Sequence, residues 1–207
     1  MNQTAGGNSF VLNNNLKFNI SKKNKYFNSS AGWVYGRQNG QLTNNDLNAV
    51  MDFELFTRPK RLYYWGLAAY DKSYSLRIND RFQGGAGAGY KIVNTKTTEI
   101  VISDGILYEF SNVRDTAAKN DDYETFRNSL RLKFHFLFSN LVQFDGVNYW
   151  QPSLSDGSDY ILKSTTTLSL KLKKWLSLTS SLTYNRVSRT NSKNLLFTAG
   201  IATDYYF

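Results

Sequence analysis

Three residue types are scarce in this sequence, since its 207 residues include no cysteine, one histidine and two prolines. The absence of cysteine fits a protein of the cell envelope, although many cytosolic proteins lack cysteine too. The single histidine, His135, excludes a cluster of histidine metal ligands, and a Ser/His hydrolase would have to be built around it. The scarcity of proline favours long, uninterrupted β-strands.

Long hydrophobic runs are also missing, since no stretch approaches the roughly 18 to 20 apolar residues of a transmembrane helix. This excludes a helical membrane protein. The negative mean hydropathy of -0.46 is compatible with a transmembrane β-barrel, because alternating polar residues dilute the average. No Pro/Ser-rich linker divides the chain, so we expect a single domain over residues 1–207.

What the sequence does contain is regular alternation of apolar and polar residues. From Phe126 to Phe138 apolar side chains occupy nearly every even position and polar side chains nearly every odd one. The exceptions are Asn128 at an even position and Leu137 at an odd one. A helical period would mix the two classes, so this segment is predicted to be a strand with one apolar face. Its length exceeds the roughly 5 to 6 residues of a soluble strand and suits the roughly 9 to 11 residues that cross a bilayer.

Eleven strands with such alternation can be read along the chain. One of them, between Thr98 and Ser111, is interrupted by Asp104, where we expect a β-bulge near Gly105. Another, from Tyr63 to Ala69, is expected to turn Tyr63 and Trp65 outward, as part of an aromatic girdle at the membrane interface.

Short and long connections alternate along the chain, Gln38 to Asn45 being among the long ones. This predicts an all-β, antiparallel up-and-down transmembrane β-barrel with one rim of turns and one rim of loops. Bacterial single-chain barrels have even strand numbers. We therefore expect about twelve strands, the first being short or truncated, with ten strands as the alternative. No signal peptide is visible before Met1, so a preceding strand and signal remain open.

The net charge is +9, and the distribution of the cations along the chain argues against a surface that binds nucleic acid. The short turns and their flanks carry nine cations and no anion, namely Lys22, Lys23, Lys25, Arg58, Lys60, Arg61, Lys96, Lys173 and Lys174. A basic rim beside an anionic phospholipid leaflet accounts for this pattern. The alternative is that lysine simply suits turns.

With the apolar faces turned outward, the opposite faces are predicted to line a lumen. The candidate residues are charged or titratable, and they are expected either to set selectivity or to brace a closed interior: Arg127, Arg131, Lys133, His135, Lys163, Asp52, Glu54, Glu99 and Glu109. A regular hairpin would place Glu109 diagonal to Arg127 and Glu99 opposite His135. No catalytic residue, metal site or cofactor is predicted. The glycine run after Gln83 lacks the spacing of a dinucleotide site and is expected either to permit a bend or to leave room for bulky neighbours.

Three landmarks resemble the YdiY-like family of salt-induced outer membrane proteins, a domain of unknown function. They are Gly7-Asn8-Ser9, the stretch LRINDRFQGGAGAGY from Leu76 followed by IVISDGILYEF, and the closing Tyr205-Tyr206-Phe207. Together they span essentially the whole chain. The resemblance implies an outer-membrane β-barrel with a further strand before Gly7.

Tyr205 and Phe207 also resemble the terminal signal by which barrel proteins are recognised by the envelope's assembly machinery. The expected location is the cell outer membrane, and the expected partners are its lipid and that machinery. Three roles stay open. The first is a narrow channel for small solutes or ions, the second is a closed or partner-binding barrel in an envelope complex, and the third, less favoured, is a soluble lipocalin-like binder.

Overall fold

The computed structural model describes residues 2–4, 7–57, 61–114, 120–139, 141–173 and 176–203, which form one antiparallel sheet. The strands are β1 (Asn2–Thr4), β2 (Gly7–Lys22), β3 (Lys25–Gln38), β4 (Gln41–Phe56), β5 (Leu62–Ser73), β6 (Ile78–Asn94), β7 (Thr98–Arg114), β8 (Asn120–Asn128), β9 (Leu130–Phe138), β10 (Val142–Pro152), β11 (Tyr160–Lys173), β12 (Leu176–Val187) and β13 (Ser192–Thr203). Within the described ranges, no helix is long and apolar enough to cross a membrane.

The strands form an up-and-down meander in which each pairs with its sequence neighbour. β8 and β9 are two parts of one strand, because both pair with β7 in the same register, Ile106 lying opposite Asn128 and Ser103 opposite Arg131. Counted in this way the sheet has twelve strands, of which β1 has only three residues. The prediction of about twelve strands with a short first one is confirmed.

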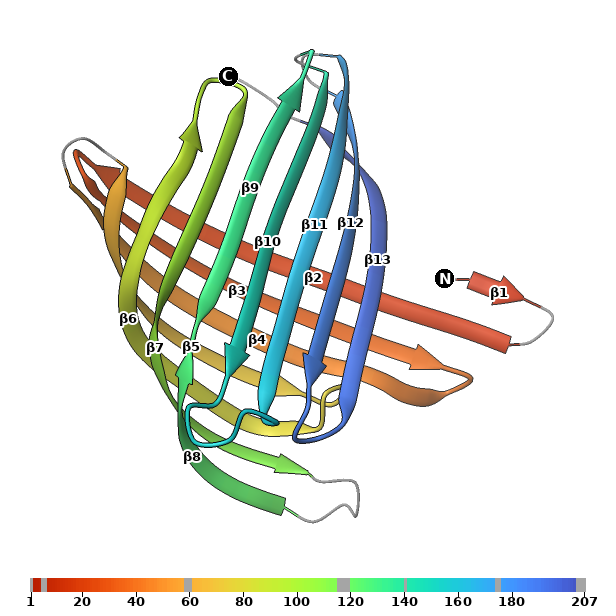
Figure 1. The fold of residues 1–207 in the computed structure, drawn as a ribbon. Helices are drawn as coiled ribbons and strands as arrows, with labels where there is room; N and C mark the ends of the chain where they lie inside the picture. The colour runs from red at the N-terminus through yellow and green to blue at the C-terminus, as the bar shows by residue number, and fades with distance from the viewer. Residues whose placement is uncertain are drawn as a thin grey trace.

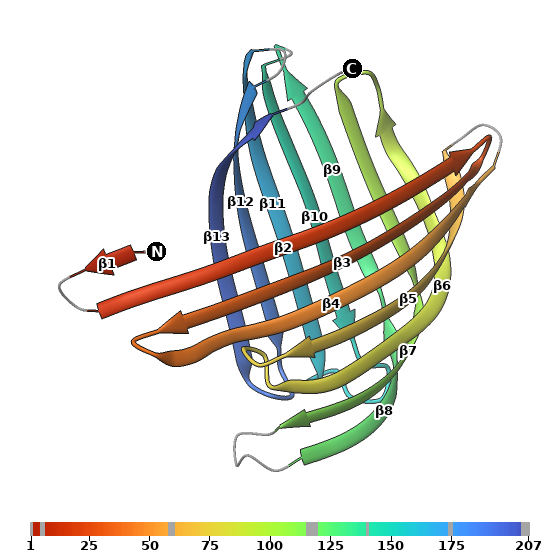
Figure 2. The same cartoon turned by 180° about the vertical axis from the view of Figure 1, so that it is seen from behind.

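The sheet curls into the shape of a barrel (Figure 1). β2 to β5 form one wall and β9 to β13 form the opposite wall, with β6 and β7 linking the two; the view from behind in Figure 2 shows the same arrangement. Strands of the two walls cross at a steep angle, as tilted barrel strands do. In the described part of the chain, no pairing joins β13 back to β1 or β2.

The barrel has two rims. At the turn rim lie the connections β2–β3, β4–β5, β6–β7, β9–β10 and β11–β12, and at the loop rim lie β3–β4, β5–β6, β7–β8, β10–β11 and β12–β13. The hairpin of β8 with the end of β7 projects beyond the loop rim (Figure 1).

The polarity of the molecule is reversed relative to a water-soluble protein. Large apolar side chains stand on the outer surface, with Leu16 73%, Met51 57% and Phe197 66% exposed. The most deeply buried side chains include Arg127 and Glu109, both at 0%. A soluble domain buries its apolar residues and almost never buries charged ones unpaired, whereas a transmembrane barrel turns its apolar face to lipid.

One strand face was assigned wrongly from the sequence. Tyr63 is 1% exposed and packs inside the barrel with Phe56 and Val101, whereas Tyr64 is 53% exposed on the outside. The run Leu-Tyr-Tyr-Trp is apolar at consecutive positions, so alternation could not fix its phase. Trp65 likewise packs against the inner cluster. These two aromatics therefore do not belong to an outer girdle.

The glycines of β6 explain why the inner face of β5 can hold such bulk. A Cβ atom added to Gly87 would collide with the indole of Trp65, and one added to Gly89 would collide with the ring of Tyr63. Only glycine leaves room for these rings. Of the two expected roles of the glycine run, room for bulky neighbours is the one that the structure confirms.

Two further local expectations were wrong. The register of β6 with β7 is unbroken at Asp104, which lies opposite Ala88, so there is no bulge there. The connection expected from Gln38 to Asn45 is a two-residue turn, because Asn39 (φ 52°) and Gly40 (φ 78°) both adopt the positive φ of a tight hairpin. The strands β3 and β4 are longer than predicted as a result.

Candidate functional site

The nine predicted lumen residues are placed by the structure at two levels of the barrel interior. Glu109 (β7), Arg127 (β8) and Lys163 (β11) lie toward the loop rim. Toward the turn rim lie Asp52 and Glu54 of β4, Glu99 of β7, and Arg131, Lys133 and His135 of β9. Whether these residues set selectivity stays a prediction.

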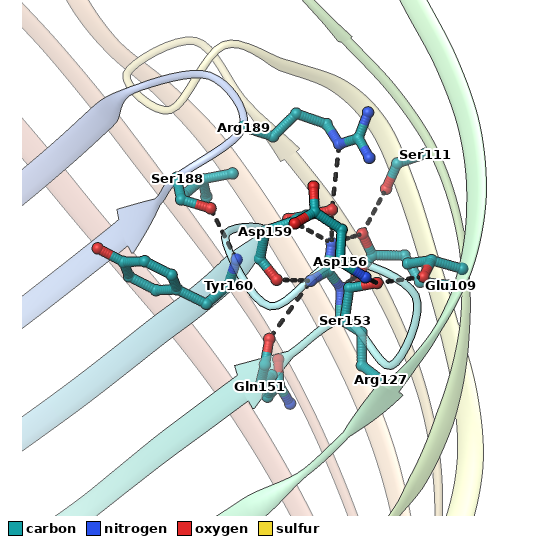
Figure 3. Close-up of polar contacts among 12 residues, drawn as sticks. Glu109, Ser111, Arg127, Gln151, Ser153, Asp156, Asp159, Tyr160, Ser188 and Arg189 are labelled. Carbon is teal, nitrogen blue, oxygen red and sulfur yellow. Dashed lines mark hydrogen bonds and ion pairs between the residues drawn. The ribbon is translucent and has the colours of Figure 1, made fainter.

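At the loop rim, Arg127 occupies the centre of a buried ion-pair network (Figure 3). Its Nε donates to Glu109 Oε2 at 2.9 Å, and its Nη2 donates to Glu109 Oε1 at 3.0 Å. The same Nη2 donates to both carboxylate oxygens of Asp159, at 3.0 and 3.1 Å. The side chains of Arg127 and Glu109 are fully buried and that of Asp159 is 4% exposed. Such charges are stable inside a protein only when paired and hydrogen-bonded.

Further side chains satisfy Glu109. Gln83 and Tyr123 each donate to it at 2.6 Å, and Arg81 lies 3.7 Å away. Because the donors come from β6 and β8 on either side of β7, the carboxylate ties three neighbouring strands together.

The β10–β11 connection is tied to β8 by this network, and the N–H of Leu154 also donates to the carbonyl of Phe126 at 2.8 Å. Nη1 of Arg127 donates to the backbone carbonyl of Gln151, near the end of β10, and to that of Asp159, the last residue of the connection. Within the connection the N–H of Ser153 donates to the carbonyl of Asp159 at 2.7 Å. This bond continues the β10–β11 hairpin by one pair beyond Pro152 opposite Tyr160.

The β12–β13 connection forms hydrogen bonds with the β10–β11 connection. Arg189 donates to Asp159 Oδ2 at 3.1 Å and to Asp121 Oδ2 at 3.0 Å. The hydroxyl of Thr190 donates to the carbonyl of Leu76 in the β5–β6 connection at 2.9 Å. These contacts join three connections across the loop rim. We call them together the loop cap, which consists of residues 74–77, 153–159 and 188–191.

Two titratable groups of the loop cap have shifted pKa values. Burial acts to lower the pKa of Arg189, but the hydrogen bond to Asp121 and the charge of Asp159 outweigh it, so this pKa is raised. The pKa of Asp156 is lowered from 3.8 because Ser158 donates hydrogen bonds from its hydroxyl and its backbone N–H. Both groups keep their charge at neutral pH.

The lumen is bridged from wall to wall at two levels. Near the loop rim, Lys163 Nζ of β11 lies 2.8 Å from Asp71 Oδ2 of β5. Nearer the turn rim, Nη2 of Arg131 in β9 donates to Tyr63 Oη of β5 at 2.7 Å and to Glu54 of β4 at 3.3 Å. Contacts of this length across the interior show that side chains from the two walls meet at both levels.

A cavity of about 510 Å³ lies on the turn-rim side of the second bridge, and the residues of that bridge form part of its wall. Its walls combine aromatic rings with charged and amide side chains, and its lining residues are Tyr26, Asn28, Asp52, Glu54, Phe56, Tyr63, Lys91, Asn94, Glu99, Val101, Arg131, Lys133, Val147 and Tyr149. The volume falls within the range of small-molecule sites.

Most charges of this cavity are paired with a charge of the opposite sign, and Asp52 is held by an amide. Glu99 accepts from Lys91 at 2.7 Å and lies 3.3 Å from Lys133. Asp52 accepts from Asn28 at 2.8 Å. The cavity wall therefore carries both signs close together and has no strong net charge.

Both cross-strand pairings expected from the sequence are present in the strand register, but only one of them brings the two side chains into contact. Glu99 lies opposite His135, as predicted, yet His135 contacts Asp145 at 2.6 Å on the other neighbouring strand. Glu109 is diagonal to Arg127, as predicted, and here the side chains do meet. Tyr205 and Phe207 lie outside the described residues.

Several site residues were missed by sequence reasoning. Arg81 stands two positions before Gln83, so alternation alone could have placed it in the lumen. Asp159 and Arg189 lie in connections, where no periodicity reveals the direction of a side chain. Among the described residues, no group of three or more His, Cys, Asp and Glu side chains is arranged to hold a metal ion.

Comparison with known proteins identifies the family. The family model described as a protein of unknown function, DUF481, matches residues 2–201. The chain belongs to the DUF481 family. This agrees with the resemblance to YdiY-like proteins noted in the sequence. No curated protein matches the chain by sequence.

Two solved structures share the fold of this DUF481 protein. A NanC porin aligns with a TM-score of 0.59 at 10% identity, covering 96% of this chain and 97% of that chain. A KdgM porin aligns with a TM-score of 0.50, also at 10% identity, with the same coverage of both chains. At this identity the likeness shows a common architecture, namely the antiparallel β-barrel of outer-membrane porins.

Proposed function

We propose that this DUF481 protein is an integral outer-membrane β-barrel that acts as a narrow channel for small solutes or ions. The observation that carries the proposal is the reversed polarity, an apolar outer surface around a lumen lined by paired charges. The shared fold with two porins supports it. The proposed role is passive and non-enzymatic.

The membrane location predicts opposite behaviour of two adjacent residues of β9. Leu132 is exposed on the outer face, whereas Lys133 faces the lumen cavity. Leu132→Arg is expected to impair insertion by about 2 to 4 kcal/mol for a cation at mid-membrane. Lys133→Leu is expected to insert normally. Equal effects of the two changes on folding into lipid vesicles would contradict the assigned faces.

The channel role predicts a small conductance that the loop cap restricts. Asp159 joins Arg127 to Arg189, so Asp159→Ala is expected to loosen the cap and raise single-channel current in a planar bilayer. Asp156→Ala is the matched control, because this exposed loop carboxylate bonds only within its own connection. Absence of current from both variants and from the wild-type protein would rule out the channel.

A second candidate is a closed barrel that braces or joins an envelope complex. The complete burial of Arg127 and Glu109 beneath the loop cap favours it. It predicts no conductance together with a stoichiometric partner after gentle extraction in detergent. A soluble binder instead predicts a chain that stays folded without detergent.

Assembly and lipid contacts complete the proposal. The lipid of the outer membrane would surround the apolar face, and the envelope's barrel-assembly machinery would recognise Tyr205 and Phe207. Deleting these two residues is expected to lower the amount of folded protein in the outer membrane while leaving its refolding in detergent unaffected.

A further inference from the structure

Two cations lie directly opposite each other on the outer face of the barrel, near the loop rim. β12 and β13 lie side by side (Figure 1), and their register pairs Arg186 with Lys193. The next pair toward the rim, Val187 and Ser192, is buried inside the barrel, so alternation turns the two cations outward. Like charges directly opposite each other destabilise a sheet, so this pair needs a counter-charge.

The part of the chain that the structure describes supplies no such counter-charge. Arg186 and Lys193 form no ion pair there, and their side chains donate no hydrogen bond. The described carboxylates of β10 to β13 and their connections are those of Asp145, Asp156 and Asp159, and each is held by another residue. Residues 1–45 contain no Asp or Glu, so β1 or β2 beside β13 in a closed barrel would bring none either.

The guanidinium of Arg186 is positioned by an aromatic ring. Its central carbon lies over the ring of Tyr160 on β11, 5.5 Å from the ring centroid. Contact with a ring face orients the plane of a guanidinium and leaves the N–H groups at its edge free to donate. The residue of β11 directly opposite Arg186 is the uncharged Leu162, so it does not compete for those donors.

The cation pair lies at the level expected for the membrane interface. The strand registers place Trp150 in the same outward row as Arg186 and Lys193, across β10 to β13, and Trp150 is 49% exposed. Exposed tryptophan is typical of the boundary between hydrocarbon and water. Farther toward the turn rim on β13, Leu195 and Phe197 are each 66% exposed. The outer face is therefore charged at the interface and apolar beneath it.

We propose that Arg186 and Lys193 together bind the phosphate group of a membrane lipid in the leaflet at the loop rim. The proposal rests on the membrane location proposed above. Directly opposite side chains have Cβ atoms about 4.5 to 5.5 Å apart, so both cations reach one phosphate. The guanidinium donates two parallel hydrogen bonds to phosphate oxygens, and the ammonium adds a point charge.

A lipid fits this site better than a water-soluble phosphate compound, because the site has an apolar continuation. The acyl chains of a lipid whose phosphate lies on the two cations extend over Leu195 and Phe197. A soluble phosphate would leave both side chains uncovered. Anionic headgroups are also the partners that cations at a membrane surface attract.

The test counts the lipid molecules bound to the full chain in micelles of an uncharged detergent, by native mass spectrometry. The probes are phosphatidic acid and diacylglycerol with the same acyl chains, so the phosphate is their only difference. The wild-type chain is expected to bind diacylglycerol at least about tenfold more weakly. Arg186→Gln and Lys193→Gln are each expected to lose one bound phosphatidic acid, and to need about tenfold more lipid to regain it.

Lys72→Gln is the matched control, because it lowers the net charge by the same amount. Lys72 is an exposed cation on the outer face of β5 near the loop rim, and its neighbour across the strand pair is the uncharged Leu47. This variant should bind as many phosphatidic acid molecules as the wild type. Folding of all three variants is checked by heat-modifiable migration in electrophoresis.

Equal binding of the two probes by the wild-type chain overturns the proposal, as do Arg186 and Lys193 variants that bind like the wild type. A Lys72 variant that loses as much lipid overturns it too, since net charge alone would then explain binding. Competition by glycerol phosphate as strong as that by phosphatidic acid would overturn the assignment to a lipid. A chain that binds the lipid without carrying current counts against the channel alone, whereas a conducting chain without phosphate-dependent binding overturns this proposal alone.

Discussion

Removal of the Arg127 guanidinium is the perturbation whose cost can be worked out most directly from the structure. The group is fully buried and donates to two carboxylates and two backbone carbonyls. Arg127→Leu leaves Glu109 and Asp159 buried without their shared cation. Breaking one side of a buried ion pair costs roughly 3 to 5 kcal/mol. The donors that Glu109 keeps from Gln83 and Tyr123 place the expected loss toward the lower end.

The matched control is Lys133→Leu, which also removes a lumen cation. Lys133 is 48% exposed and pairs with Glu99 at 3.3 Å, so its loss should cost no more than about 1 kcal/mol. Unfolding of the full chain by urea in lipid vesicles, followed by tryptophan fluorescence, measures both variants. Equal destabilisation by the Arg127 and Lys133 variants would refute the reasoning.

Two smaller predictions concern a glycine and a carboxylate. Gly89→Val should destabilise the barrel by about 1 to 3 kcal/mol, because the new side chain would overlap the ring of Tyr63, whereas Gly200→Val, with no atom within 4 Å of an added Cβ, should have little effect in the same urea titration. The pKa of Asp156, lowered below 3.8 by Ser158, should move back up in Ser158→Ala, because the hydroxyl donor is lost while the backbone N–H remains; NMR titration of the carboxyl would show this, and an unchanged midpoint would contradict it.

Periodicity predicted the fold well because a barrel strand has only two faces. Once Phe126 to Phe138 was assigned, the same period located the other strands and the inner position of Glu109 opposite the apolar face. Periodicity failed where four apolar residues follow one another, from Leu62 to Trp65, because no phase is then preferred. It also overlooked the Asn39-Gly40 pair, whose turn chemistry gives a tight hairpin where a loop was expected.

The site was harder to predict than the fold, for a physical reason. A strand residue has its direction fixed by its neighbours, whereas the direction of a loop residue is set by tertiary contacts. Asp159 illustrates this, since its role depends on Arg127 reaching it from a strand 32 residues earlier. The outward Asp104 was visible as an irregularity, but its contact with Asn128 emerged only from the register of β7 and β8.

The central claim is that the apolar outer surface touches hydrocarbon while the opposite face does not. Because the chain contains no cysteine, single-site labelling can test it directly. A fluorescent label is attached in turn at Leu132→Cys and Lys133→Cys, and the protein is folded into vesicles that contain lipids with a quencher in the acyl chain. The account predicts strong quenching at position 132 and little at position 133. Equal quenching at both, or a labelled chain that folds without lipid or detergent, would contradict it.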